Sequence, residues 1–169
     1  MNKVLIIDTS ILCVWLNVPG KDSCGPDDDK WDKQRVENKI GIESQNGSTF
    51  VLPIATIIET GNHIAQAPQY RRERGFSLAA LISKSADNET PWAAFSDQSI
   101  LWSTAKMKAL ASAWPDLALQ KLSLGDATIK DVAEYYAESG YIVEILTGDQ
   151  GLKAYQPAVP TEIPRRRQR

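Results

Sequence analysis

The sequence predicts an α/β protein with three layers, in which helices cover both faces of a central, mostly parallel β-sheet. Residues 4–7 read Val-Leu-Ile-Ile, and such an unbroken apolar run is typical of a strand that is buried on both faces. Residues 141–146 form another β-type run, and each of the two runs is followed by a carboxylate and then by a helical pattern. Strand and helix patterns alternate along the chain, as the crossover connections of a parallel sheet require.

The composition is that of a globular domain. The chain has 169 residues, of which 43% are hydrophobic and 24% are charged, so it can bury a core and is not intrinsically disordered. No apolar run approaches the roughly 18–20 residues that a membrane span needs, and the short run after Lys3 makes a poor signal peptide. We therefore expect a cytoplasmic protein without a membrane partner.

Cysteine and histidine are too scarce for several kinds of site. Cys13 and Cys24 cannot build a disulfide framework or a zinc site, and two free thiols fit a reducing compartment. His63 is the single histidine, which excludes centres that need several histidine ligands.

The charge is unevenly distributed. The net charge is −2, and the four arginines within 165–169 contribute +4 to it, so residues 1–164 carry −6. The sequence therefore predicts one acidic domain, residues 1–157, followed by a tail rich in proline and arginine, residues 158–169.

The first elements follow from local signals. The strand at 3–7 leads into a helix for which Thr9 or Ser10 offers the N-cap side chain. Residues 17–29 are expected to form a loop, and three aspartates at its end favour the start of a helix over 30–44.

The middle of the chain predicts one strand and two helices. Residues 49–52 are β-branched and aromatic, and Pro53 closes this strand. Over 54–66 apolar side chains recur at intervals of three and four, which predicts an amphipathic helix. A further helix is expected over 70–88.

The last part of the chain completes the alternation. A helix over 97–113 is expected to end at Pro115, and another helix runs from 126 to 139. The strand at 141–146 follows, and a short helix over 150–155 ends the domain.

Carboxylates stand at positions where such a fold gathers side chains. Asp8 and Asp149 follow strands, and ligands of open parallel sheets bind outside the carboxyl ends of the strands. Asp126 stands at a helix N-terminus, and Glu59 lies on the polar stripe of an apolar helix. Four carboxylates in one cleft would repel one another unless cations compensate them, and oxygen ligands favour Mg²⁺ or Mn²⁺. This combination points to phosphate chemistry.

Each acid also has an ordinary structural alternative. Asp8 and Asp126 could cap helices, Glu59 could lie on a solvated helix face, and Asp149 could be a turn residue. Only the combination of the four favours a site.

The four acids lie in stretches of sequence that resemble, in order, the acidic motifs of PIN-domain nucleases. The stretches are residues 4–10 (Val-Leu-Ile-Ile-Asp-Thr-Ser), 53–59 (Pro-Ile-Ala-Thr-Ile-Ile-Glu), 124–129 (Leu-Gly-Asp-Ala-Thr-Ile) and 145–152 (Ile-Leu-Thr-Gly-Asp-Gln-Gly-Leu). They span nearly the whole chain. The last of them, a strand that closes in Thr-x-Asp, is the most specific.

The resemblance implies a set of site residues. Ser10 and Thr147 would support the acids through hydrogen bonds. The catalytic acids, which would hold Mg²⁺ or Mn²⁺, are Asp8, Glu59, Asp126 and Asp149.

The resemblance also implies an activity. The expected reaction is metal-dependent hydrolysis of RNA phosphodiester bonds by an endoribonuclease that leaves 5′-phosphate and 3′-hydroxyl ends. The family includes toxins of bacterial toxin–antitoxin pairs, so an antitoxin-like protein partner and a homodimer are further expectations. The chain is longer than the compact toxins, with extra residues around 17–45 and 88–120. Asp131 could be a fifth acid of the site or a surface residue.

An acidic domain needs local basic groups to bind RNA. Each of them could equally lie on a solvated face. The candidates are Arg71, Arg72, Arg74, Lys106, Lys108 and the tail arginines within 165–169.

Other side chains could also touch RNA. Trp92, Phe95 and Trp102 could stack on bases or pack in the core. Asn62 and His63 share the polar stripe of Glu59 and could contact the substrate, although His63 has no base partner that the sequence reveals.

Two other functions are open. A PIN-like fold could serve as a non-catalytic scaffold or as a subunit of a larger assembly, although a scaffold has no need of four mutually repelling acids. A phosphatase of the haloacid-dehalogenase type also begins with a strand and an aspartate. It needs a second aspartate two positions later, where this chain has Ser10. The chain has no glycine-rich phosphate loop, which removes nucleoside-triphosphate enzymes.

Overall fold

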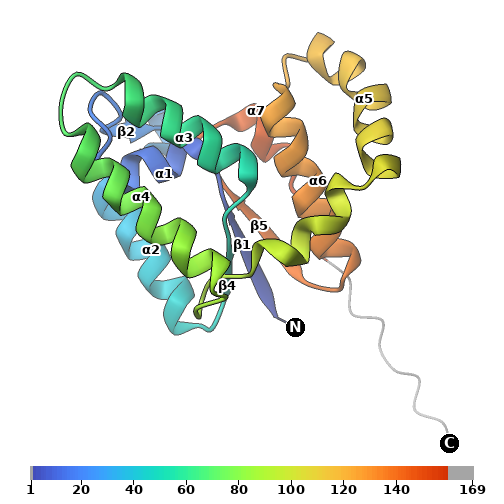
Figure 1. Ribbon diagram of the computed structural model, residues 1–169, viewed down its shortest axis with the longest axis horizontal. Coiled ribbons are helices and arrows are strands. Elements are labelled where there is room, and N and C mark those ends of the chain that lie inside the picture. The colour runs from blue at the N-terminus through green and yellow to red at the C-terminus, as the bar shows by residue number, and fades with distance from the viewer. Residues whose placement is uncertain (1, 160–169) are drawn as a thin grey trace, which may run out of the picture.

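The computed structural model describes residues 2–159, and a three-stranded parallel sheet lies at its centre (Figure 1). The strand order is β4 (Thr49–Val51), β1 (Lys3–Ile7) and β5 (Ile142–Leu146), and β1 pairs in parallel with both neighbours. The first strand of the chain is therefore the central one, as its apolar run predicts.

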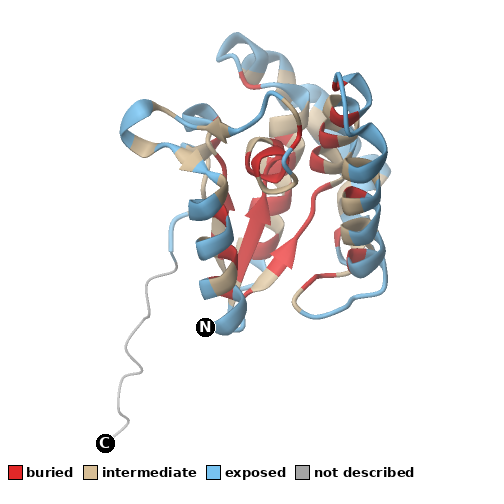
Figure 2. Cartoon of the chain, turned by 90° about the vertical axis from the view of Figure 1, so that its left-hand side faces the viewer, coloured by how far each residue is buried: buried red, intermediate tan, exposed pale blue. Residues whose placement is uncertain are grey.

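The side chains of β1 divide between two cores. Leu5 and Ile7 pack into one hydrophobic cluster, and Val4 and Ile6 pack into another. Successive side chains of a strand point to opposite faces of the sheet, so the alternation places one cluster on each face. All four side chains are fully buried, and Figure 2 shows the strands as the buried centre of the molecule.

Helices cover both faces, so the predicted α/β/α arrangement is confirmed. Figure 1 shows the two groups of helices on opposite sides of the sheet. The first group consists of α1 (Thr9–Trp15), α2 (Lys33–Gln45), α3 (Ile54–Gln66) and α4 (Arg71–Ala86). The second consists of α6 (Leu124–Glu138) and α7 (Gln150–Lys153).

A small ribbon lies between α1 and α2. Strands β2 (Ser23–Cys24) and β3 (Trp31–Asp32) pair antiparallel around a 3₁₀ turn, η1 (Asp27–Asp29). The prediction that the three aspartates open the next helix was wrong. The side chain of Asp32 caps that helix by accepting a hydrogen bond from the backbone N–H of Arg35 at 2.8 Å, so α2 begins three residues later than predicted.

The predicted helix at 97–113 was wrong at both ends. Residues Phe95–Trp102 form a 3₁₀ helix, η2, and Ser103 caps a separate helix, α5 (Thr104–Leu119). Pro115 lies inside α5 rather than after it. Proline lacks the N–H of one intrahelical hydrogen bond, and here the helix continues through that loss.

The first strand and α3 have the predicted bounds, and the ends of the other predicted elements differ by at most two residues. The predicted tail at 158–169 lies outside the described residues except for its first two. Within residues 2–159, no helix combines the length and the hydropathy needed to cross a membrane.

Candidate functional site

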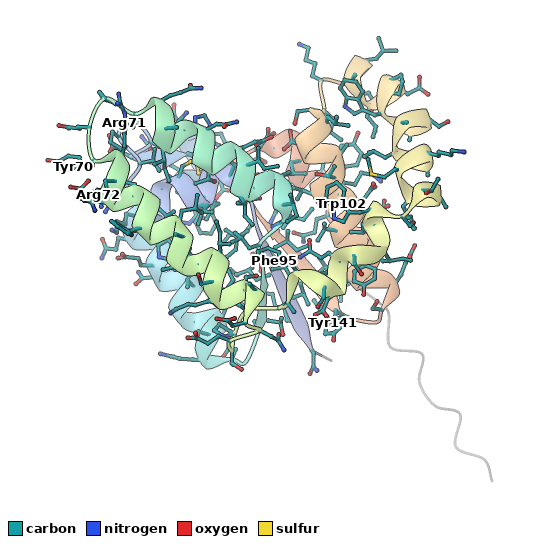
Figure 3. All side chains as sticks on the ribbon, in the orientation of Figure 1. Tyr70, Arg71, Arg72, Phe95, Trp102 and Tyr141 are labelled. Carbon is teal, nitrogen blue, oxygen red and sulfur yellow. The ribbon has the colours of Figure 1, made fainter. Side chains whose placement is uncertain are left out.

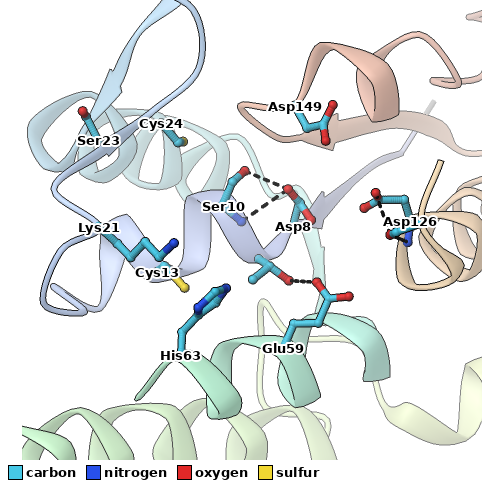
Figure 4. Close-up of a pocket in the computed structure, with 12 residues that line it drawn as sticks. Asp8, Ser10, Cys13, Lys21, Ser23, Cys24, Glu59, His63, Asp126 and Asp149 are labelled. Carbon is cyan, nitrogen blue, oxygen red and sulfur yellow. Dashed lines mark hydrogen bonds between the residues drawn. The ribbon is translucent and has the colours of Figure 1, made fainter. Parts of the chain in front are cut away.

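The carboxyl ends of β1 and β5 lie side by side and open into a cleft (Figure 4). The backbone N–H of Asp8 donates to the carbonyl of Leu146 at 3.1 Å, which joins the two strand ends. The cleft has a volume of about 320 Å³. Its walls include Ser10 and all four predicted acids, Asp8, Glu59, Asp126 and Asp149.

Asp8 is the most buried of the four acids, with 4% of its surface exposed. Its Oδ2 accepts hydrogen bonds from the hydroxyls of Ser10 and Thr147, each at 2.7 Å, and from the backbone N–H of Ser10 at 3.3 Å. Asp8 thus caps α1 itself, and the prediction of Thr9 or Ser10 as the cap was wrong. Within residues 2–159 its other oxygen, Oδ1, accepts no hydrogen bond, so it is available to a ligand.

Thr147 connects Asp8 to Asp149. Its hydroxyl donates to Asp8 and accepts from the backbone N–H of Asp149 at 2.9 Å. The Oδ1 of Asp149 in turn accepts from the backbone N–H groups of Gly151 at 2.7 Å and Leu152 at 3.3 Å, which caps the short helix α7. One buried hydroxyl therefore sets the relative position of two acids from different strand ends.

Glu59 reaches the cleft from α3. Its Oε2 accepts a hydrogen bond from the Thr9 hydroxyl at 3.0 Å. Its Oε1 lies so close to Gly125 that a Cβ at that position would collide with it. The glycine thus allows α6 to approach Glu59, which places Glu59 beside Asp126.

Asp126 lies in the first turn of α6, where the helix dipole favours a carboxylate. The helix N-cap is Ser123, whose hydroxyl donates to Asp126 Oδ2 at 2.8 Å and accepts from the Asp126 backbone N–H at 3.0 Å. Partial burial raises the pKa of Asp126, and the negative charges of Asp8, Asp149 and Glu59 raise it further. The four acids are thus close enough to act on one another electrostatically.

The donor set suits a hard divalent cation. Carboxylate and hydroxyl oxygens line the acidic part of the cleft, and these are the ligands of Mg²⁺ and Mn²⁺. Within residues 2–159, no three acidic, histidine or cysteine side chains are already drawn together around one point as metal ligands. The acids share a cleft, and Mg²⁺ commonly binds one or two carboxylates directly while water molecules complete its coordination.

The cleft also contains side chains that the sequence did not place there. Lys21, Ser23 and Cys24 come from the segment before and within β2, and Cys13 comes from α1. Burial raises the pKa of the Cys13 thiol to about 11 and also raises that of Cys24, so both remain protonated at neutral pH. No periodic pattern in this segment could have revealed its position.

His63 lies one turn after Glu59 on α3 and lines the same cleft. The shared stripe predicted this neighbourhood, because residues four apart lie on one helix face. Asn62, the other residue of the predicted stripe, does not line the cleft.

Asp131 lies elsewhere. It lines two other pockets beside α5 and forms an ion pair with Lys130 at 3.8 Å. Of the two alternatives for Asp131, the surface position is the one that the fold shows.

The basic residues predicted to bind RNA also lie outside the cleft. Arg71 and Arg74 donate from Nε to the backbone carbonyls of Ala67 and Asn17, and Arg72 lies over the ring of Phe76. Figure 3 shows Arg71 and Arg72 at the start of α4. Lys106 and Lys108 belong to α5, on the other side of the molecule.

The three aromatic candidates have different environments. Trp92 is buried, stacks on Trp15 with ring centroids 6.3 Å apart and meets Phe50 edge-on, so it packs in the core. Phe95 is half-buried. Trp102, which Figure 3 labels, is 47% exposed. It lines an apolar groove of about 270 Å³ that shares Glu59 with the acidic cleft.

Comparisons with known proteins give no match to a family model, to a curated protein or to a solved structure.

Proposed function

We propose that this protein is a metal-dependent endoribonuclease. The observation that carries the proposal is that four carboxylates from four different elements line one cleft around the buried Asp8. The resemblance of the four motifs to those of PIN-domain nucleases supports the same reaction. It also extends the proposal to an antitoxin-like partner that would regulate the enzyme, and to a homodimer.

The electrostatics favour a bound cation. Asp8 is buried, and within residues 2–159 no lysine, arginine or histidine forms an ion pair with it or with the other three acids. A buried carboxylate without a cationic partner is costly, and neighbouring carboxylates increase the cost. The fold retains this arrangement, which supports the view that a cation from solution completes it.

The acids would divide the work with their supporting hydroxyls. Asp8, Glu59, Asp126 and Asp149 would hold one or two Mg²⁺ or Mn²⁺ ions. When bound, these ions lower the pKa of a water molecule and neutralise charge on the scissile phosphate. Ser10 and Thr147 keep Asp8 oriented, and they leave its Oδ1 open to the cleft. The chain would supply positioning, because phosphodiester hydrolysis depends on an in-line arrangement of water and phosphate.

The test uses labelled single-stranded RNA with Mg²⁺ or Mn²⁺. The variants Asp8→Asn and Asp149→Asn remove one acid each, and Asp116→Asn, an exposed acid on α5, is the matched control. We expect cleavage that EDTA abolishes, that both cleft variants lose and that the control retains.

Calorimetry of Mn²⁺ binding separates the remaining outcomes. Absence of both cleavage and metal binding would refute the enzyme and favour the non-catalytic scaffold. Metal binding that depends on Asp8 but is never accompanied by RNA cleavage would keep the metal site and refute RNA as its substrate.

A further inference from the structure

We propose that Lys21 and His63 bind a second phosphate of the RNA strand, adjacent to the phosphate that is cleaved. The inference rests on the proposed ribonuclease activity and names two residues that would determine which RNA substrates the enzyme prefers. It would make the enzyme prefer an internal bond of a strand, which has phosphates on both sides, over a dinucleotide, which has only one.

The cleft has two chemically different ends (Figure 4). Asp126, Asp149 and Glu59 lie toward one end, while Lys21 and His63 lie toward the other, with Asp8 between the two groups. A strand that placed one phosphate at the acids would therefore extend along a cleft whose other end carries a cation and an imidazole. A lysine ammonium is a point charge that binds phosphate oxygens, and an imidazole N–H donates to them.

Lys21 has a charge that the fold does not use. It lies in the turn between α1 and β2, where its backbone N–H donates to the carbonyl of Val18 at 2.9 Å. Its side chain forms no ion pair within residues 2–159, although four acids line the same cleft. Its charge acts on the neighbouring Cys13 thiol, whose pKa it lowers against the larger, opposing effect of burial.

The segment that carries Lys21 is held in place. The buried Val18 packs into the core beneath α1, and Asn17 accepts a hydrogen bond from Arg74 at 3.0 Å. On the other side of Lys21, Cys24 lies against Gly148, where an added Cβ would come within 2.7 Å of its sulfur. Lys21 is thus presented to the cleft from a loop that is held on both sides.

His63 is placed by the same helix as a predicted catalytic acid. It follows Glu59 by four residues on α3, so the two side chains share one face of the helix. Figure 4 shows the imidazole ring directed toward Lys21 and Cys13. The helix therefore couples the position of the second phosphate to that of the acids.

A simpler role for Lys21 is to neutralise the acids. That role predicts an ion pair, which Lys21 does not form with any residue of the described chain, and it predicts an effect on metal affinity. Phosphate binding instead predicts an effect on RNA affinity and on its dependence on salt, because each phosphate contact to a single strand contributes about 0.7 to the slope of log K against log salt.

The test measures binding of a fluorescent single-stranded RNA of 12 nucleotides by anisotropy, with Ca²⁺ in place of Mg²⁺, across a series of salt concentrations. We expect Lys21→Met to weaken binding roughly tenfold and to reduce the salt slope by about 0.7. Lys21→Arg should restore most of the affinity. Lys30→Met removes an equal, exposed charge from the neighbouring ribbon, outside the cleft, and should change neither quantity. His63→Ala should weaken binding, and His63→Gln, which keeps a donor, should weaken it less.

A second measurement identifies the phosphate. RNA strands that carry one neutral methylphosphonate, on either side of the cleaved bond, are compared in cleavage by the wild type and by Lys21→Met. At one of the two positions we expect the methylphosphonate to raise the KM of the wild type roughly tenfold. The same methylphosphonate should not raise the KM of Lys21→Met further, because that variant already lacks the lysine that would contact this phosphate. The proposal would be overturned if Lys21→Met and Lys30→Met had equal RNA affinities and salt slopes. It would also be overturned if, at both positions, the methylphosphonate and Lys21→Met raised KM independently of each other.

The two proposals fail in distinguishable ways. A wild type that cleaves RNA but whose binding and KM ignore Lys21 would refute the phosphate site and keep the nuclease. A wild type that binds RNA through Lys21 but never cleaves it would refute the nuclease and keep the phosphate site.

Discussion

Replacing Thr147 by valine removes one hydroxyl from the centre of the candidate site and changes little else, because the two side chains have the same shape. The Thr147 hydroxyl is buried, donates to the Asp8 carboxylate at 2.7 Å and accepts from the backbone N–H of Asp149 at 2.9 Å. A hydrogen bond to a charged group contributes about 1.5–3 kcal/mol and a neutral one about 1 kcal/mol. We expect Thr147→Val to lower the free energy of unfolding by about 3 kcal/mol, part of which water at the exposed Asp149 can return.

The matched variant is Thr147→Ser, which keeps the hydroxyl and loses one buried methyl group. Its expected cost is about 1 kcal/mol from the lost apolar burial. Urea unfolding at pH 7 measures both variants against the wild type. Because the hydroxyl orients Asp8, Thr147→Val should also reduce RNA cleavage by roughly 10–100-fold, as replacements behind metal ligands do, whereas Thr147→Ser should retain most of it. A Thr147→Val protein no less stable than Thr147→Ser would refute the reasoning.

Two further predictions concern Glu43, which lies outside the cleft, and Gly125, which lies against Glu59. Burial opposes the ionisation of Glu43, but hydrogen bonds from Lys3, Lys39 and a serine outweigh it and lower the pKa to about 2 from 4.5. The stabilisation that ionised Glu43 contributes is therefore complete above pH 4.5 and is lost as the pH falls toward 2. It amounts to at most about 3 kcal/mol. The variant Glu43→Gln should flatten this part of the profile of unfolding free energy against pH. Gly125→Ala should displace the flexible end of Glu59 and reduce metal affinity and cleavage severalfold, while stability changes by less than about 1 kcal/mol, since alanine favours the helix. Unchanged calorimetric Mn²⁺ affinity in Gly125→Ala would contradict the role given to this contact.

Local sequence patterns were sufficient to predict the central strand and the main helix of the site. The apolar run at 4–7 predicts the central strand because a strand buried on both faces can hold no polar side chain. The period of three and four in 54–66 predicts α3, whose bounds it matches. The same patterns predict that Asp8 and Asp149 share a crevice if their strands are neighbours, and the fold pairs those two strands in parallel.

Helix starts were less predictable where several capping side chains compete. Asp8, Asp32 and Ser123 each cap a helix that another nearby residue could have begun. Which one accepts the free N–H groups depends on the direction in which the preceding strand or loop delivers the chain, and that direction is set by tertiary packing.

The remaining features of the site arise only in three dimensions. Lys21 and Cys24 reach the cleft because an irregular ribbon folds back against Gly148, more than a hundred residues away along the chain, and irregular segments have no period to read. Asp131, five residues after Asp126 on the same helix, faces the pockets beside α5 instead. Strand ends and helix faces follow from the spacing of residues along the chain, whereas contacts between a loop and a distant turn follow from which surfaces the packed core leaves adjacent. That physical difference explains why the sequence predicts the acids of this cleft, whereas only the folded chain reveals that Lys21 lies in it.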